Sequence, residues 1–366
     1  MALQQDVVDQ LEDAFARRDS GRRSESLQRI TDLFVTAAKR HSPDQIALFD
    51  EVMGRLVAEV ETSARATFGH RMATVADAPP RVVRKLALDE AVEVAAPVLL
   101  NSERLDDTTL VESAKTGTHG HLMAISRRKV LAEAVTDVLV ERGDSAVALS
   151  TARNPGAKFS DFGFSTLVRR SEADDGLAMA VWARPEIPRQ HRLQLFTHAS
   201  EAVRSKFESD DPRKAALIRG MVASASEQIQ AKARDTDTRY AAARAQVEAL
   251  RAAGRLDEAQ LTAFARGGDF DAAAVALSIM TDLPIGPVER AIVNDRPEQI
   301  FILTKALGFT WETTEAILML DPGFRRGPKR DIEACRETFG RLQATTATKA
   351  LHFYRLRERA ATTSSG

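Results

Sequence analysis

A degenerate helical repeat of about 30 residues constrains the fold of this 366-residue chain more than any other feature. Three apolar segments end in a proline, at Pro97, Pro155 and Pro185, and a second amphipathic segment follows each proline. Proline cannot continue a helix, and it disfavours the helical conformation of the residue before it. The pattern therefore predicts helix pairs with a proline at each corner. Such pairs bury their apolar faces against neighbouring pairs, which builds an extended surface without an obligatory active-site cleft.

Four of these helix pairs are predicted across roughly residues 86–200. In one copy, HLMAISRRK, Lys129 takes the place of the corner proline, so that successive corners lie 32, 26 and 30 residues apart. Recurring helix pairs with uneven spacing are typical of HEAT-like solenoids. The predicted fold class is therefore all-α: a HEAT-like α-α superhelix (a solenoid of helix pairs) followed by a second, smaller helical domain.

Two long amphipathic helices are expected before the repeats, at residues 24–39 and 43–66. The second is predicted to begin with Ser42 as its N-cap and Pro43 at its first position. We expect this pair to form the end layer that a solenoid needs.

The chain is predicted to divide into three segments. Residues 1–205 carry the N-terminal helical pair and the solenoid, residues 206–255 form a long connecting helix or helices that begin at Asp211-Pro212, and residues 256–366 form a C-terminal helical-repeat domain with a short disordered tail. The last segment repeats itself with an offset of 26 residues, and this alignment matches Trp311 with Ile285. The match favours a core role for Trp311 over a role as a ligand platform.

The connecting segment carries an apolar stripe that weakens along the helix, which predicts partial exposure. Two interpretations stay open: a homodimer surface across residues 212–253, and a solvated helix between domains. The stripe consists of Leu217, Ile218, Met221, Val222, Ala225 and Ile229.

Composition excludes several classes of protein. The chain is 44% hydrophobic and 28% charged, as globular proteins are, and its single cysteine, Cys335, excludes an internal disulfide framework. The N-terminus is acidic and amphipathic, unlike a signal peptide, and no apolar run is long enough to span a membrane. We therefore expect a cytoplasmic protein without membrane association. A net charge of −1 gives no general attraction to nucleic acid, which disfavours it as a partner.

No set of residues has the spacing that catalysis, a cofactor or a metal requires, so no catalytic, cofactor-binding or metal-binding residue is predicted. The chain contains no phosphate-binding loop, dinucleotide fingerprint, zinc-protease motif or nucleophile elbow. His119 and His121 flank Gly120, but a metal would need further ligands that the nearby sequence does not supply. We interpret both histidines as residues of a loop or a helix start.

Two groups of basic and polar residues are candidate binding sites. The first lies at the corners of the repeats and is predicted to contact a protein partner, with capping and solvation as the alternative: Arg153, Asn154, Arg184 and Arg189. The second lies where residues 321–360 carry ten basic against five acidic side chains, a net charge of +5. It is a candidate anion or nucleic-acid patch, with a solvated loop as the alternative: Arg325, Arg326, Lys329 and Arg330.

The repeat segments also resemble a known family. Over roughly residues 80–355 the chain is similar to an uncharacterised alphaproteobacterial domain-of-unknown-function (DUF) family of HEAT-like helical repeat proteins. The resemblance rests on the segments VAAPVLL, HLMAISRR, VTDVLVERGD, RNPGAKFSDFGFSTLV, ARPEIPRQHRLQLF and LRAAGRLDEAQL. It supports the fold class and implies no catalytic residues.

Two functions are open at this point. The first is a non-enzymatic protein–protein interaction module or regulatory scaffold that uses the helical-repeat surface to hold an unknown protein partner. The alternative is a nucleic-acid-binding HEAT-like protein with a groove like that of the HEAT-like DNA glycosylases. The near-neutral charge of the chain stands against the alternative.

Overall fold

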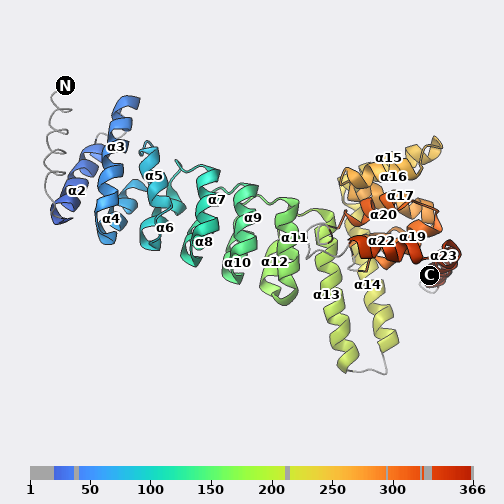
Figure 1. The fold of residues 1–366 in the computed structure, drawn as a ribbon. Coiled ribbons are helices and arrows are strands. Elements are labelled where there is room, and N and C mark those ends of the chain that lie inside the picture. Colours follow the sequence, from blue (N-terminus) through green and yellow to red (C-terminus); the bar gives the residue numbers. More distant parts are fainter. Residues whose placement is uncertain are drawn as a thin grey trace. The chain divides into compact units, whose positions relative to one another are not determined.

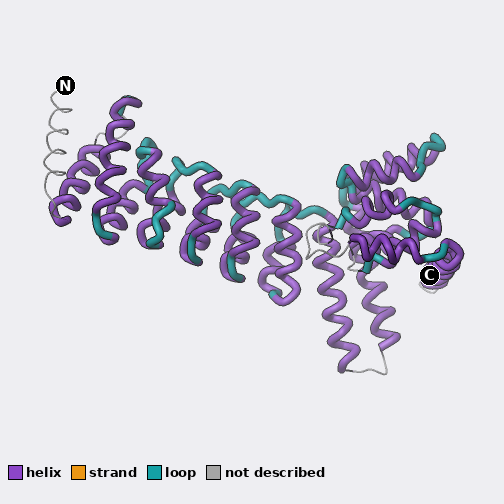
Figure 2. The backbone as a smooth tube through the Cα atoms, in the orientation of Figure 1, coloured by secondary structure: helices purple, strands orange, loops and turns teal. Residues whose placement is uncertain are grey.

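The computed structural model describes residues 20–36, 41–210, 215–293, 296–321, 324 and 332–363. Within these residues every regular element is a helix (Figures 1 and 2), and the only β-type contact is an isolated bridge between Leu131 and Ala157. The all-α fold is therefore confirmed. The predicted disordered tail includes residues 364–366, which lie outside this description. Among the described helices, none combines the length and the apolar character needed to cross a bilayer.

Contacts divide the chain into two compact units. Unit 1 comprises the described residues up to Leu167 together with Met179–Val181, and unit 2 comprises Val168–Ala178 and the described residues from Trp182 onward. This division differs from the expected segments 1–205, 206–255 and 256–366, because residues 206–255 are not a separate connection. Their helices pack on those of the C-terminal repeat and belong to the same unit.

Unit 1 consists of helix pairs in two rows (Figure 1). The helices α4, α6, α8 and α10 pack successively in one row, and α3, α5, α7 and α9 pack in the other. Each pair thus contacts mainly the pairs before and after it, as expected of a solenoid. The helices are α2 (Ser20–Thr36), α3 (Pro43–Glu59), α4 (Thr62–Met72), α5 (Pro80–Ala87), α6 (Val92–Asn101), α7 (Asp107–Thr116), α8 (His119–Ser126), α9 (Glu133–Arg142) and α10 (Ser145–Arg153).

Side chains of one helix pair hold the exposed backbone carbonyls of the pair before it. Arg128, just after α8, donates to the carbonyls of Leu99 and Ser102 at the end of α6, and Arg142 at the end of α9 donates to Ala114 near the end of α7. The last carbonyls of a helix have no partner within it and carry partial negative charge. An arginine from the next pair therefore satisfies them and fixes the register between pairs.

Asn154 performs the same task at the corner after α10. Its amide Nδ2 donates to the carbonyls of Ser126 and Arg128, over 2.8 and 2.7 Å, and its Oδ1 accepts from the backbone nitrogen of Gly156 over 2.8 Å. The helix ends at Arg153 and Pro155 follows, so the predicted corner is confirmed. The corner at Pro185 is confirmed likewise, because α12 (Asp175–Trp182) ends before it.

The predicted corner at Pro97 is wrong, because Pro97 lies inside α6. Proline there removes one helical hydrogen bond, the bond to the carbonyl of Glu93 in the first turn. The apolar face of α6 is fully buried, with Val94, Val98 and Leu99 at 0% exposure, and this burial outweighs the lost bond.

The predicted helix at residues 43–66 is in fact two helices. Ser42 caps α3 through a capping box with Gln45, and Pro43 is its first residue, as expected. The helix ends at Glu59 because Val60 is extended and its side chain is buried at 4% exposure. Arg65 of α4 then donates to the freed carbonyl of Val60 over 3.0 Å, which stabilises the break.

Unit 2 is built around α17, a helix that is buried on nearly all sides. Residues 272–277 of this helix are each at most 5% exposed, and α15, α16 and α18 pack against it. A helix that is apolar all round belongs in a core. After α11 (Asp161–Arg170), a short 3₁₀ helix (Ser171–Ala173) and α12, the helices are α13 (Arg189–Asp210), α14 (Ala215–Asp235), α15 (Thr238–Ala252), α16 (Glu258–Arg266), α17 (Phe270–Thr281), α18 (Ile285–Val293), α19 (Glu298–Ala306), α20 (Trp311–Leu318), α22 (Ile332–Arg341) and α23 (Ala344–Thr363).

The 26-residue repeat corresponds to the helix pairs α17–α18 and α19–α20. Trp311 begins α20 just as Ile285 begins α18, and its ring packs near Phe301 and Phe339, with ring centroids 6.2 and 5.6 Å away. The predicted core role of Trp311 is therefore confirmed. The predicted connecting segment forms two helices, α14 and α15, and its start at Asp211-Pro212 lies outside the described residues.

Replacing Asn154 tests whether the corner bonds stabilise unit 1. We expect Asn154→Ala to lower the free energy of unfolding by about 1–3 kcal/mol, because two carbonyls and one backbone nitrogen lose their partner. Hydrogen–deuterium exchange of the segments around α8 and α10, together with urea unfolding, measures the effect. The neighbouring Arg153 is exposed, and Arg153→Ala should change stability by less than about 0.5 kcal/mol. Equal effects of the two substitutions would contradict the role of Asn154.

Candidate functional site

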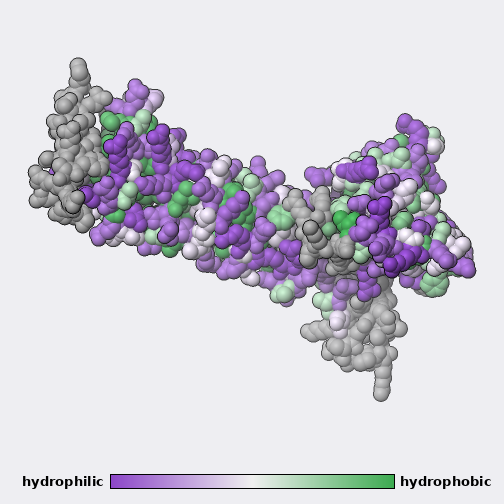
Figure 3. All heavy atoms as spheres, in the orientation of Figure 1, coloured by the Kyte–Doolittle hydropathy of each residue, from purple (hydrophilic) through white to green (hydrophobic). Residues whose placement is uncertain are grey.

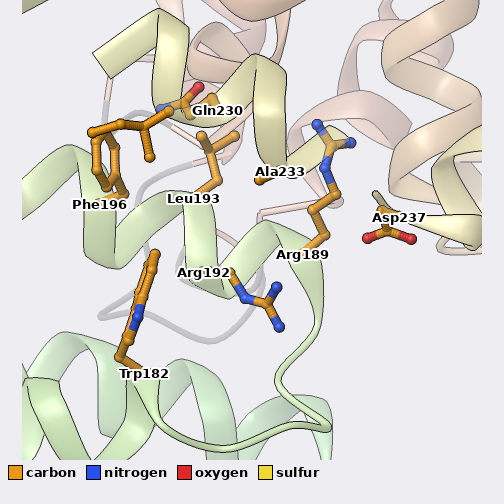
Figure 4. Close-up of a pocket in the computed structure, with 9 residues that line it drawn as sticks. Trp182, Arg189, Arg192, Leu193, Phe196, Gln230, Ala233 and Asp237 are labelled. Carbon is orange, nitrogen blue, oxygen red and sulfur yellow. The ribbon is translucent and has the colours of Figure 1, made fainter. Parts of the chain in front are cut away.

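The candidate site is a small hollow in unit 2 that opens to solvent. Its walls come from the end of α12, the first turns of α13, the second half of α14 and the start of α15 (Figure 4). We call it the α13–α14 hollow. It is lined by Trp182, Arg189, Arg192, Leu193, Phe196, Ile229, Gln230, Ala233 and Asp237.

Three large apolar side chains give the hollow its apolar character. Trp182 is 41% exposed and Ile229 is 53% exposed, although both are large hydrophobic residues. Phe196 lies beside Trp182, with ring centroids 6.4 Å apart, so that the two aromatic rings form one continuous surface. On the face shown in Figure 3, hydrophilic side chains predominate over the helices of unit 1. Exposed aromatic surface next to a hollow is the kind of feature that binding sites use.

Helix α13 brings two arginines to the hollow within its first turns. The helix follows Pro188, whose carbonyl accepts from the backbone nitrogens of His191 and Arg192, each over 3.1 Å. The N-terminal end of a helix carries partial positive charge, so cations there are unfavourable unless anions compensate them. Arg189 and Arg192 therefore both call for carboxylate partners.

Arg189 finds its partners inside unit 2. Its guanidinium donates to Asp271 of α17 and Glu289 of α18, and it stacks over the ring of Tyr240 at 4.5 Å from the centroid. The Glu289 side chain has no exposed surface, and those of Arg189 and Asp271 are 13% and 14% exposed. The contact thus connects α13 to the central helix of the core.

Helix α14 joins the same group of charges. Arg234 donates to the second oxygen of Glu289 over 2.9 Å and also to Glu227, which in turn accepts from Arg290 over 2.8 Å. Three arginines thus face three carboxylates, which balances the charge. We call this group the ionic cluster: Arg189, Arg234, Arg290, Glu227, Asp271 and Glu289. A side chain at position 286 would collide with the Glu227 carboxylate, which explains the glycine there.

Burial and pairing pull the pKa values of the cluster in opposite directions. Burial raises the pKa of Glu289 above its usual value against the opposing charges of Arg189 and Arg234, and burial likewise raises the pKa of Asp271. Burial also acts to raise the pKa of Glu227, but hydrogen bonds from Arg234 and Arg290 outweigh it and hold the pKa below 4.5. The arginines remain charged, because attraction to Glu289 overcomes the burial that disfavours the Arg189 and Arg234 cations.

Arg192 differs from Arg189 in having no such partner. Its side chain is partly buried and lines the hollow, yet no ion pair or side-chain hydrogen bond connects it to any other described residue. In Figure 4 it is drawn between Trp182 and Asp237. Asp237 is occupied as the N-cap of α15, where it accepts from the backbone nitrogens of Arg239 and Tyr240 over 2.9 and 3.3 Å.

Gln230 supplies a second polar group without a partner. The residue is 8% exposed, and its Oε1 is buried without a hydrogen-bond partner among the described residues. An unpaired buried acceptor costs about 1–3 kcal/mol and calls for an explanation. The hollow therefore combines an apolar wall with a cation and an amide oxygen that have no partner in the described part of the chain.

The structure places the four predicted partner-binding residues in different environments. Arg153 is exposed, whereas Asn154 is occupied by backbone groups of its own unit. Arg184 is 8% exposed and pairs with Glu186 over 2.5 Å, and Arg189 belongs to the ionic cluster. For Asn154, Arg184 and Arg189 the geometry favours a structural role, and of the four only Arg153 presents an exposed side chain.

The other predicted sites give no binding geometry. The basic patch of Arg325, Arg326, Lys329 and Arg330 lies outside the described residues. His121 is buried, with Nε2 2.9 Å from the carbonyl oxygen of Asp89, and His119 pairs with Asp144 over 3.0 Å. Within the part of the chain that is described, no three His, Cys, Asp or Glu side chains are placed to hold a metal ion.

The sequence pattern did not single out the hollow. Ile229 belongs to the apolar stripe of the connecting segment, and no local pattern distinguishes Trp182, Arg192 or Phe196 from their neighbours. One signal was available: the stripe that weakens around Ile229 predicted partial exposure, which is confirmed for Ile229 itself.

Comparison with known proteins adds a family. The model of a family described as uncharacterised protein conserved in bacteria (DUF2336) matches residues 94–352. No curated protein and no solved structure matches the chain. The predicted relationship to an uncharacterised DUF family is confirmed, whereas its alphaproteobacterial origin and HEAT-like class stay predictions.

Replacing Glu289 tests the ionic cluster. We expect Glu289→Gln to destabilise the protein by about 3 kcal/mol at neutral pH, because two buried arginines lose the anion that they share. Urea unfolding measures the loss. Glu248→Gln is the matched control, because Glu248 pairs with Arg244 on the exposed surface of α15, and it should cost less than about 1 kcal/mol. Similar costs for the two variants would contradict the assigned role of Glu289.

The pH dependence of a Glu227 variant tests the direction of its pKa. Since the folded-state pKa of Glu227 lies below 4.5, its contribution to stability is present above pH 4.5 and is lost as the pH falls through the lowered pKa. We expect Glu227→Gln to cost about 0.5–1 kcal/mol at pH 7. Urea unfolding of both proteins from pH 7 downward should show this difference shrink below pH 4.5, and a difference that grew on acidification would contradict the pKa.

Proposed function

This chain belongs to the family of uncharacterised proteins conserved in bacteria (DUF2336), and since that membership assigns no activity, we propose that it is a non-enzymatic interaction module. In this proposal a partner protein binds at the α13–α14 hollow. The observation that carries the proposal is the exposure of Trp182 and Ile229 on the walls of that hollow. Large apolar side chains in pockets contribute much of the affinity of protein interfaces.

The surroundings of the hollow support a rigid binding surface. The ionic cluster fixes α13 and α14 to α17 and α18, and Arg189, one of its members, also lines the hollow. A preorganised surface loses little conformational entropy on binding. The hollow therefore offers its apolar walls to a partner without prior rearrangement of the helices.

The shape of the hollow supports a protein partner more than an enzyme substrate. Enzyme sites enclose most of the ligand surface and exclude water around the reacting groups. The hollow is open to solvent, so it can take up one or two side chains of a larger partner. In addition, two of its three charged residues serve other purposes: Arg189 is paired and Asp237 caps a helix.

The proposal extends to location and fold class. We place the protein in the cytoplasm, which its single cysteine supports, because secreted domains commonly depend on disulfides. We also propose that unit 1 is HEAT-like, which its two rows of successive helix pairs support. Exposed Ile229 on α14 is compatible with the predicted homodimer across residues 212–253, so a second copy of the chain is one partner to test.

Capture experiments test the proposed function. The full-length protein is immobilised, incubated with bacterial lysate, and the bound proteins are quantified by mass spectrometry; recovered partners are then titrated against the protein. We expect Trp182→Ala and Ile229→Ala each to weaken the binding of a specific partner by about tenfold or more. Phe353→Ala is the control, because Phe353 is 62% exposed on α23 and does not line the hollow.

Two outcomes would decide against the proposal. Partner binding that is equal in all three variants would mean that the hollow is not the interface. Sedimentation velocity of the free protein distinguishes a homodimer from a complex with another protein. If a second copy of the chain binds in the hollow, Trp182→Ala and Ile229→Ala should weaken self-association.

A further inference from the structure

Arg192 carries a positive charge that no described residue of unit 2 balances. Its neighbour Arg189 faces two carboxylates, whereas Arg192 has no ion pair with any residue that the structure describes. The N-terminal end of α13 repels the charge further. A partly buried guanidinium of this kind is complementary to a carboxylate from outside the unit, which it can hold with two parallel hydrogen bonds.

Gln230 adds a specific requirement for a backbone group. Its side chain lines the hollow, and its buried Oε1 accepts no hydrogen bond among the described residues. Rotating the amide by half a turn exchanges the oxygen and the nitrogen, so the group can present either an acceptor or a donor to a ligand. A peptide bond supplies both partners, a donor N–H and an acceptor carbonyl.

The apolar walls complete the pattern. Trp182, Phe196 and Ile229 line the hollow, and an apolar side chain of a partner can pack against them. The hollow thus offers one apolar slot, one cation and one amide, all within the space drawn in Figure 4.

From these three features we infer that the α13–α14 hollow binds an acidic–apolar peptide segment of a partner protein. The apolar side chain of the segment fills the space between Trp182, Phe196 and Ile229, and a neighbouring Asp or Glu pairs with Arg192. A backbone group of the segment hydrogen-bonds to the amide of Gln230. This inference rests on the proposed function and adds the chemistry of the partner.

The same features argue against other occupants. Nucleic acids and anionic membranes are held by several cations spread along the surface, because each phosphate contributes a charge. Among the residues that the structure describes, Arg192 is the one cation on the walls without a partner, and the other charged lining residues, Arg189 and Asp237, are already engaged. A single carboxylate beside a single apolar side chain matches this balance.

A selection from a random peptide library displayed on phage tests the inference. The full-length protein is the bait, and we expect the enriched peptides to carry Asp or Glu close to Leu, Ile, Phe or Trp. Fluorescence anisotropy measures the affinity of a labelled enriched peptide. Arg192→Glu should lower this affinity by about tenfold or more. When the Arg192→Glu variant is the bait, the selection should enrich peptides that carry Lys or Arg in place of the acidic residue.

Matched variants control for folding and for general charge effects. Arg266→Glu reverses an exposed charge on α16 that does not line the hollow, and it should leave peptide affinity unchanged. Circular dichroism and thermal unfolding verify that each variant is folded. Should Arg192→Glu fail to fold, Arg192→Met removes the charge while keeping the apolar stem, and it should also weaken binding.

Gln230→Leu separates binding from stability. Because the wild-type amide oxygen is unpaired, an apolar replacement should leave the thermal midpoint unchanged or raise it. The same substitution should lower the affinity for the enriched peptide several-fold, because the hydrogen bond to the peptide backbone is lost. A merely structural glutamine would give the opposite result, a lower midpoint with unchanged affinity.

The outcomes distinguish this inference from the proposed function. If Trp182→Ala abolishes binding of a captured partner but Arg192→Glu does not, the hollow is an interface and the inference of an acidic segment is wrong. Enriched peptides without acidic residues, or peptides that bind Trp182→Ala as tightly as the wild type, would also overturn the inference. Loss of acidic–apolar peptides with both Trp182→Ala and Arg192→Glu, and retention with Arg266→Glu, would establish it.

Discussion

Glu289 is the residue on which the arrangement of α13 and α14 in unit 2 depends. Its carboxylate has no exposed surface, and it is shared by Arg189 of α13 and Arg234 of α14. A buried charge is tolerated only when it is paired and hydrogen-bonded. The folded state therefore requires the two arginines and the carboxylate to be in contact. This requirement fixes both helices to α18, in addition to the packing of Leu193 of α13 in the core. The walls of the α13–α14 hollow are therefore set by an electrostatic constraint as well as by apolar packing.

Local sequence rules predicted the elements but not their long-range partners. Ser42 and Pro43 start a helix, and Pro155 and Pro185 follow helix ends, because capping and the proline ring act within a few residues. Pro97 does not end its helix, because the burial of α6 outweighs one lost hydrogen bond. Tertiary burial therefore decides where local signals are weak.

The candidate site shows the limit of the sequence more clearly. Arg189 looked like a surface arginine at a repeat corner, yet its partners Asp271 and Glu289 lie 82 and 100 residues further along the chain. The periodicity of a sequence does not predict ion pairs between residues so far apart in the chain. The contrast with Arg192, three residues later on the same helix, is equally invisible in the sequence, because it depends on which carboxylates the fold brings near. Only the partial exposure of the stripe at Ile229 could be predicted, since a weakening apolar pattern has a local cause.

The two tryptophans of the chain occupy different environments, and this has a practical consequence. Trp311 is partly buried and packs against the core near Phe301 and Phe339, whereas Trp182 is 41% exposed on the wall of the hollow. Indole emission shifts to shorter wavelength when water is displaced from the ring. A protein with Trp311 replaced by phenylalanine would therefore emit from the hollow alone, and the chain would carry its own optical sensor of occupancy, with no label attached to either molecule.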